Sequence, residues 1–233
     1  MTSTLRTFPW VLFRSLRLIP WWYLGLGLAA AFALATTRRN PYPDDLVFGL
    51  RVGAVALATS TAFVFDDPAG NIMDGKPVPL SLQRAARLFV ALPVVAASWW
   101  LLVTWMEAGL GPQNERAIAA LPKWALTLEL VTLVGVVWAV ATLVMLTGRD
   151  AGGTVAALSL LTVVVLLVLL PERWSVFPSL AVAPEPGWEA WVDGHRRWAG
   201  IAVIAWAAVA LGVVGSTRRQ PTVARLPIPG RTR

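Results

Sequence analysis

The 233-residue sequence contains no cysteine and a single histidine, His195. The lack of cysteine excludes disulfides, thiolate metal sites and cysteine nucleophiles. One histidine argues against a histidine-based metal site and against a serine–histidine relay within the chain. No paired carboxylates stand at a spacing typical of acid–base catalysis. We therefore expect no catalytic residues, no metal site and no cofactor in this chain.

Charged residues are also scarce, at 14% of the sequence, whereas hydrophobic residues make up 57%. Soluble domains usually carry about a quarter charged residues. Several apolar runs reach about 20 residues, which is enough to cross a hydrocarbon core of about 30 Å. The sequence thus predicts a single-domain, all-α integral membrane protein. Its net charge of +7 fits lysine and arginine facing anionic lipid, so we expect a lipid partner and no nucleic acid.

The apolar runs predict a transmembrane domain at residues 20–216. Before it, residues 1–19 predict an amphipathic cytoplasmic helix on the membrane surface, with a disordered basic tail as the alternative. After it, residues 217–233 form a basic cytoplasmic tail. Six spans are expected, at about residues 20–37, 45–65, 83–106, 122–147, 153–170 and 198–215.

The distribution of lysine and arginine orients these spans. Placing both termini inside puts most of the basic residues on the inner side, although Arg38 and Arg39 oppose this. We expect a multi-pass protein of the plasma membrane with cytoplasmic termini. The loop at 66–83 is then cytoplasmic. The segment at 171–197 is external, with an interfacial helix carrying Trp188, Trp191 and Trp198 and with His195 at a solvated end.

The polar stretch between the second and third spans predicts a short, stiff helix at residues 68–74. Asp67 and Pro68 are a helix-start signal, and Gly75 followed by Pro77 is a stop signal. Residues 70–77 also match a phosphate-binding loop except at the end, where Pro77 replaces the required hydroxyl. No strand precedes them. We therefore expect this chain to bind no nucleotide and not to be an enzyme.

Glu129 is a carboxylate inside the fourth predicted span. Such groups are expensive in the membrane and usually face protein or water. It is interpreted either as a substrate or proton contact or as half of an ion pair, with Arg51 or Lys123 as its partner. Trp138 and Trp206 also lie deep in their spans, where they either line a path for a bulky apolar substrate or pack in the core.

The layout resembles the permease subunits of ABC transporters, specifically the small six-span exporter permeases of the type-2 class. The resemblance rests on the basic amphipathic helix, the short capped helix after the second span and interfacial helices before the sixth. The local run Phe65-Asp66-Asp67-Pro68-Ala69, followed by Pro77, Pro79, Arg84 and Arg87, is also similar to short permeases of that kind.

The resemblance implies an exporter whose ATP and Mg²⁺ are bound by a separate ATPase subunit. It also implies a second permease chain, as a homodimer or heterodimer. The ATPase would dock on the short helix, through Asp66, Asp67, Pro68, Asn71, Met73 and Asp74.

Two other functions remain open from the sequence. A membrane accessory or scaffold subunit fits the composition equally well. A secondary transporter would use Glu129 as its intramembrane ionisable group, although no internal repeat is visible. Drugs, peptides, lipid-like metabolites and polymers all fit as substrates.

Overall fold

The computed structural model describes residues 19–37, 42–66, 80–111, 114–119, 121–147, 152–169 and 187–215, and within these ranges it contains helices and no strand. The predicted surface helix, apart from Ile19, the short helix at 68–74 and the basic tail fall outside these ranges. The elements are α2 (Trp21–Thr36), α3 (Pro43–Thr61), the 3₁₀ turn η1 (Ala62–Phe65), α4 (Leu80–Ala108), α5 (Glu115–Ala119), α6 (Lys123–Leu146), α7 (Gly152–Val168) and α8 (Gly187–Gly215).

Four of these helices are long and apolar enough to cross a bilayer, which indicates a membrane-embedded helical protein. They are α3 with η1, α4, α6 and α8. The apolar helices α2 and α7 are shorter, at 16 and 17 residues. A span usually needs about 20 residues, so six membrane crossings remain a prediction.

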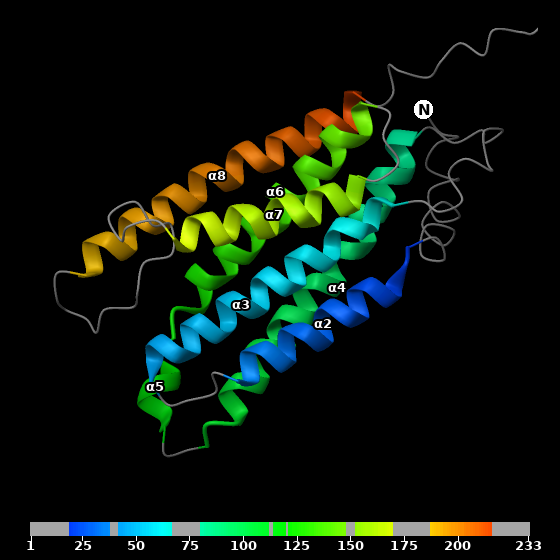
Figure 1. The fold of residues 1–233 in the computed structure, drawn as a ribbon. Coiled ribbons are helices and arrows are strands. Elements are labelled where there is room, and N and C mark those ends of the chain that lie inside the picture. Colours follow the sequence, from blue (N-terminus) through cyan, green and yellow to red (C-terminus); the bar gives the residue numbers. More distant parts are fainter. Residues whose placement is uncertain are drawn as a thin grey trace, which may run out of the picture.

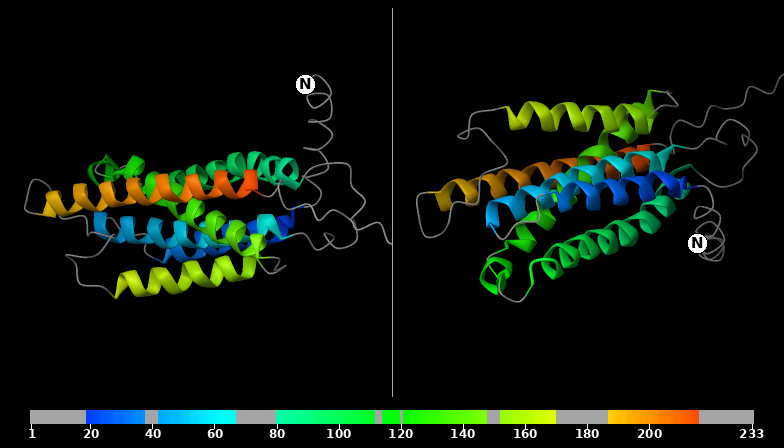
Figure 2. Two further views of the ribbon diagram at one scale, coloured as in Figure 1. Left: turned by 90° about the horizontal axis from the view of Figure 1, so that it is seen from above. Right: turned by 60° about the horizontal axis from the view of Figure 1, so that its bottom comes forward.

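The long helices lie side by side and alternate in direction along the chain (Figure 1). The start of α2 and the end of α8 therefore lie at the same end of the bundle, which we call the terminal end; the opposite end, where α3, α6 and α8 begin, is the far end. Two further views place α4 and α7 on opposite sides of the bundle (Figure 2). Helix α3 packs against α2, α4, α6 and α7, and α6 packs against α3, α7 and α8. These two helices form the centre.

Local signals explain where the central helices begin. Pro43 occupies the first turn of α3, with Asp44 and Asp45 beside it. Proline is preorganised for that position, and carboxylates there complement the positive end of the helix dipole. Pro122 immediately precedes α6. After α4 the chain turns at Gly111, whose φ of 72° is a left-handed conformation suited to glycine.

Helix α8 begins earlier than the sequence predicts. Residues 187–197, assigned to the external loop with an interfacial helix, are instead the first turns of one continuous 29-residue helix ending at Gly215. Trp191 and Trp198 are buried, at 5% and 2% exposure. The interfacial assignment is wrong for these two side chains. They are seven residues apart and so share one helical stripe, and that stripe faces the bundle.

One further helix boundary also differs from prediction. Helix α4 begins at Leu80, so residues 80–83 belong to a helix and not to the loop at 66–83. Trp99 of α4 is 1% exposed. Its indole Nε1 donates to the Thr127 hydroxyl of α6 at 2.9 Å, and this polar partner allows the ring to be buried.

Small residues allow α2 and α3 to approach closely. Gly53 of α3 faces Ala31 and Ala35 of α2 as well as Leu102 of α4. Gly27 of α2 lies directly against Ser60 of α3. In a bilayer such close backbone contact supplies the packing energy that the hydrophobic effect does not.

Replacing Gly27 by alanine should therefore destabilise the bundle. The new Cβ would overlap Cβ and Oγ of Ser60 and stand 3.3 Å from the Ala56 carbonyl oxygen. We expect a loss of about 1–3 kcal/mol, typical of overpacking, measured by thermal unfolding in mild detergent. Gly25→Ala is the matched control, because a Cβ there meets nothing within 4 Å. Equal melting temperatures for the two variants would contradict close α2–α3 packing at Gly27.

Candidate functional site

Glu129 of α6 is the most deeply buried carboxylate in the part of the chain that the structure describes, with 1% of its side chain exposed. Arg51 of α3 meets it with two parallel hydrogen bonds. The Arg51 Nε donates to Oε2 at 2.9 Å, and Nη2 donates to Oε1 at 2.7 Å. This bidentate geometry is the strongest form of arginine–carboxylate contact. The sequence predicts either Arg51 or Lys123 as the partner of Glu129. The partner is Arg51, whereas Lys123 pairs with Glu107 of α4.

Helix α8 adds His195 and Trp191 to this pair. The His195 Nε2 lies 3.2 Å from Oε1 of Glu129, without the alignment of a hydrogen bond. Its Nδ1 lies 2.9 Å from the Trp191 carbonyl oxygen. The Trp191 ring lies under the Arg51 guanidinium, 5.4 Å from Cζ to the ring centroid. We call Arg51, Glu129, Trp191 and His195 the buried ion cluster.

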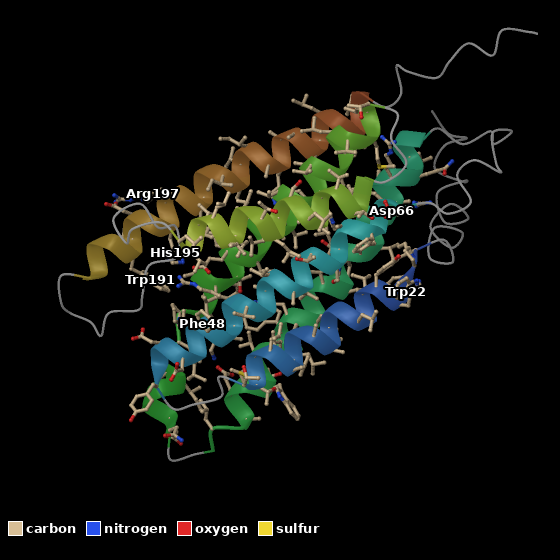
Figure 3. The ribbon with its side chains drawn as sticks, in the orientation of Figure 1. Trp22, Phe48, Asp66, Trp191, His195 and Arg197 are labelled. Atoms are coloured by element: carbon tan, nitrogen blue, oxygen red, sulfur yellow. The ribbon has the colours of Figure 1, made fainter. Side chains whose placement is uncertain are left out.

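The assignment of His195 to a solvated loop end is wrong, because its side chain is 12% exposed and faces the carboxylate. Figure 3 shows Trp191 and His195 together on the first half of α8. They are four residues apart, so they share one helical face. The four-residue spacing indicates this shared face only if the helix already includes Trp191 and His195, and it does so because α8 begins at Gly187.

The buried ion cluster joins three helices well inside the bundle. At about 1.5 Å of rise per residue, Glu129 lies about 9 Å from the start of α6 and Arg51 about 12 Å from the start of α3. Arg51 balances the carboxylate charge, and Trp191 adds a cation–π contact. Both nitrogens of His195 face an oxygen, and a neutral imidazole donates to one acceptor at most. The cluster thus holds the Glu129 carboxylate inside the bundle, paired with Arg51 and faced by the Nε2 of His195.

Trp138 and Trp206 lie in the packing between α6 and α8. Trp138 is fully buried and donates from Nε1 to the Thr61 carbonyl oxygen at 3.2 Å. Trp206 donates to the Val131 carbonyl oxygen at 3.2 Å, and the two rings meet edge to face at 5.6 Å. Both indole N–H groups are thus bonded to backbone within the bundle, as core packing requires. A role in a substrate path stays a prediction.

At the terminal end, the last residues of the second predicted span contact two other helices. The Gly153 backbone N–H donates to Oδ1 of Asp66 at 2.8 Å, so Asp66 caps the first turn of α7. Arg87 of α4, which is 4% exposed, donates from Nη1 to the Phe65 carbonyl oxygen at 3.3 Å. We call Phe65, Asp66, Arg87 and Gly153 the terminal junction. The other predicted docking residues, Asp67, Pro68, Asn71, Met73 and Asp74, lie outside the described residues.

Burial raises the pKa of Asp66 above its ordinary value of 3.8. The hydrogen bond from Gly153 and the positive charge of Arg87 oppose this shift without cancelling it. The backbone at Gly153 leaves no room for a side chain. A Cβ on Gly153 would stand 2.6 Å from Oδ2 of Asp66 and 2.8 Å from the Ala62 carbonyl oxygen. Glycine is therefore required where α7 meets the end of α3.

Neither feature has the composition of a metal centre. Across the described residues, no group of three or more histidine, cysteine, aspartate or glutamate side chains could hold a metal ion. Comparison of the chain with protein-family models, curated proteins and solved structures finds no match.

Removing one partner of the buried ion pair should destabilise the protein strongly. Arg51→Gln removes the cation that pairs with Glu129, and Glu129→Gln removes the carboxylate that accepts from Nε and Nη2 of Arg51. We expect each to cost about 3–5 kcal/mol, whereas the double variant should lose clearly less than the sum. The measurement is thermal unfolding of the four proteins in mild detergent.

The control is the Lys123–Glu107 pair, whose side chains are 35% and 20% exposed. Its removal should cost about 0–1 kcal/mol. Strict additivity of the Arg51 and Glu129 losses would show that the two side chains are not energetically coupled.

The raised pKa of Asp66 predicts a pH dependence of known sign. The folded protein holds this proton more tightly than the unfolded chain does, so wild type loses stability as the pH rises above about 3.8. Asp66→Asn keeps an oxygen acceptor for Gly153 and does not titrate. The stability of wild type relative to Asp66→Asn should therefore fall with rising pH.

Asp66→Ala removes the acceptor, and we expect a loss of about 0.5–2 kcal/mol, as for other helix caps. Melting temperatures measured from pH 4 to pH 7 test both effects. A stability of wild type that rises relative to Asp66→Asn over this range would contradict the raised pKa.

Proposed function

We propose that this chain is the permease subunit of an ATP-driven ABC exporter of the small six-span class. In this proposal α2, α3, α4, α6, α7 and α8 are the six spans, and both termini are cytoplasmic. The chain moves a substrate across the plasma membrane with energy from ATP hydrolysed by a separate subunit. It carries no nucleotide site and pairs with a second permease chain.

The observation that carries the proposal is the terminal junction. Asp66, the last described residue before the polar segment, stands where the end of α3 with η1 is bonded to α4 and α7 through Asp66, Gly153 and Arg87. A subunit that binds this segment would therefore move three helices together rather than one. The alternation of the helices supports a cytoplasmic location, because this junction lies at the same end as the start of α2 and the end of α8 (Figure 1).

The buried ion cluster supplies the second element of such a mechanism. It joins α3, α6 and α8 toward the far end, whereas the terminal junction joins α3, α4 and α7. Helix α3 belongs to both. Motion at the terminal junction would thus tilt α3 about its fixed contact with α6. The partner drives the change only if it binds the two arrangements with different affinity.

Co-purification from the native membrane tests this proposal. We expect a nucleotide-hydrolysing subunit to copurify with the wild-type chain in mild detergent. Asp67→Arg and Pro68→Gly should abolish its recovery, because both lie in the segment proposed for docking. The control is Asp193→Arg, an exposed position near the start of α8. Recovery of no ATPase under several detergents would overturn the proposal and favour an accessory subunit.

A secondary transporter is the second candidate, favoured by the buried carboxylate of Glu129 beside His195. Intramembrane ionisable groups of this kind often mark ion or proton pathways. The two candidates differ in their energy source. Uptake by vesicles that contain the chain alone, driven by an ion gradient and lost in Glu129→Gln, would favour the transporter.

A further inference from the structure

Helices α2 and α4 pack beside each other on α3 (Figure 1). Between them lies a groove of about 170 Å³ that opens at the surface of the bundle. Its lining includes Leu24, Gly25 and Leu28 of α2, the buried Leu57 of α3, and Val94 and Ser98 of α4. Gly25 leaves the α2 wall open, because a Cβ there would meet nothing within 4 Å. The groove is therefore accessible from outside the bundle.

The groove offers almost nothing to water. Among the described residues that line it, only the Ser98 hydroxyl and the Trp21 indole belong to polar side chains. A bound water needs two to four polar partners, whereas an apolar cavity of about 150 Å³ stays dry and takes up an apolar molecule. An empty groove would leave its lining atoms without dispersion contacts on one side. The groove is thus suited to an apolar occupant.

The dimensions of the groove favour a single hydrocarbon chain. Along α2 the lining residues run from Trp21 to Leu28, which is about 10 Å at 1.5 Å per residue. A volume of about 170 Å³ spread over about 10 Å has a mean cross-section of about 17 Å². A helix is at least about 10 Å across, or roughly 80 Å² in section. The groove is therefore too narrow for a helix of a partner.

The position of the groove lies within one leaflet. It begins at Trp21, the first residue of α2, at the terminal end of the bundle. Tryptophan is enriched at the headgroup level of membrane proteins. Half of a hydrocarbon core of about 30 Å is about 15 Å deep, so a groove of about 10 Å along α2 fits inside that half. A lipid with its headgroup at the terminal end would have its acyl chains at this depth.

We propose that this groove binds one acyl chain of a membrane lipid from the leaflet at the terminal end. The chain fills the space beside Gly25 and reaches Leu57, so it packs against α2, α3 and α4 together. Within a bilayer such packing contacts stabilise helix association, because burial from water contributes nothing there. This proposal requires a membrane but does not depend on the exporter function.

Photolabelling of the full chain in nanodiscs tests the proposal. The nanodiscs contain phosphatidylglycerol, a small fraction of which carries a diazirine in the half of one acyl chain nearest the headgroup. After illumination, peptide mass spectrometry locates the label. We expect residues 21–28 and 94–98 to be labelled several-fold more than the end of α8. There Leu211 and Val214 are 73% and 61% exposed at the same end of the bundle.

Filling the groove should displace the chain. Gly25→Leu should reduce the labelling of residues 94–98 several-fold, because the new side chain occupies the open space. Gly200→Leu on α8 is the matched control, since a Cβ there also meets nothing within 4 Å, and it should label as wild type does. Ser98→Leu fills the groove from the opposite wall and should reduce the labelling of residues 21–28. Either filled variant suffices if the other does not fold.

Two labelling results would overturn the proposal. One is labelling of the groove no stronger than at the end of α8, which is what lipid in passing contact gives. The other is labelling that neither filled variant reduces.

A second copy of the chain is the other occupant that the experiment distinguishes. The sequence has no cysteine, so Gly25→Cys places a single thiol at the groove. With lipid in the groove, oxidation should crosslink Gly25→Cys no more than Gly200→Cys. Efficient crosslinking through Gly25→Cys alone, together with weak labelling of the groove, would assign the groove to a partner chain and contradict lipid binding.

Discussion

The ion pair between Arg51 and Glu129 is the contact on which the arrangement of the central helices depends. Neither charge is tolerable alone at that depth. Each therefore requires that α3 and α6 meet in one register, with the guanidinium fork aligned to both carboxylate oxygens. His195 and Trp191 extend the requirement to α8. Apolar contacts between helices tolerate sliding, whereas a bidentate ion pair does not.

The two ends of the bundle use polar groups differently. At the far end, charges are paired inside the protein, by Arg51 with Glu129 and by Lys123 with Glu107. At the terminal end, the bonds run mainly between a side chain and the backbone, as between Asp66 and Gly153. Such bonds fix a helix end without requiring a second charge. The terminal end is thus held by bonds from Asp66 and Arg87 to the backbone of neighbouring segments.

Much of the helical layout could be predicted from the sequence because its signals are local. The apolar runs, Pro43 with its two aspartates, and Pro122 mark where helices begin. The start of α8 could not be predicted, because a tryptophan stripe at helical spacing looks the same whether it faces lipid headgroups or other helices. His195 was misplaced for that reason. Its surroundings depend on Glu129, which is distant in the chain.

The contacts within the candidate sites could be predicted less well than the helices. Glu129 is a carboxylate in an apolar run, which indicated that it needs a partner. The sequence offered two cations for this role, Arg51 and Lys123. The role of Asp66 as a cap for α7 could not be predicted, since Gly153 lies 87 positions further along. Nothing near either residue indicates the other. Contacts of this kind follow from the packing of α3 against α7.

The separation of Arg51 and Glu129 also bears on how the protein is made. The two residues are 78 positions apart, so at about 5–20 residues per second the carboxylate emerges on the order of ten seconds after the arginine. During that interval α3, the least apolar of the four long helices, holds Arg51 without the carboxylate of Glu129. An arginine costs about 2.5–3.5 kcal/mol at the centre of an inserting helix. The contact that fixes α3 against α6 thus forms only after α6 has been synthesised.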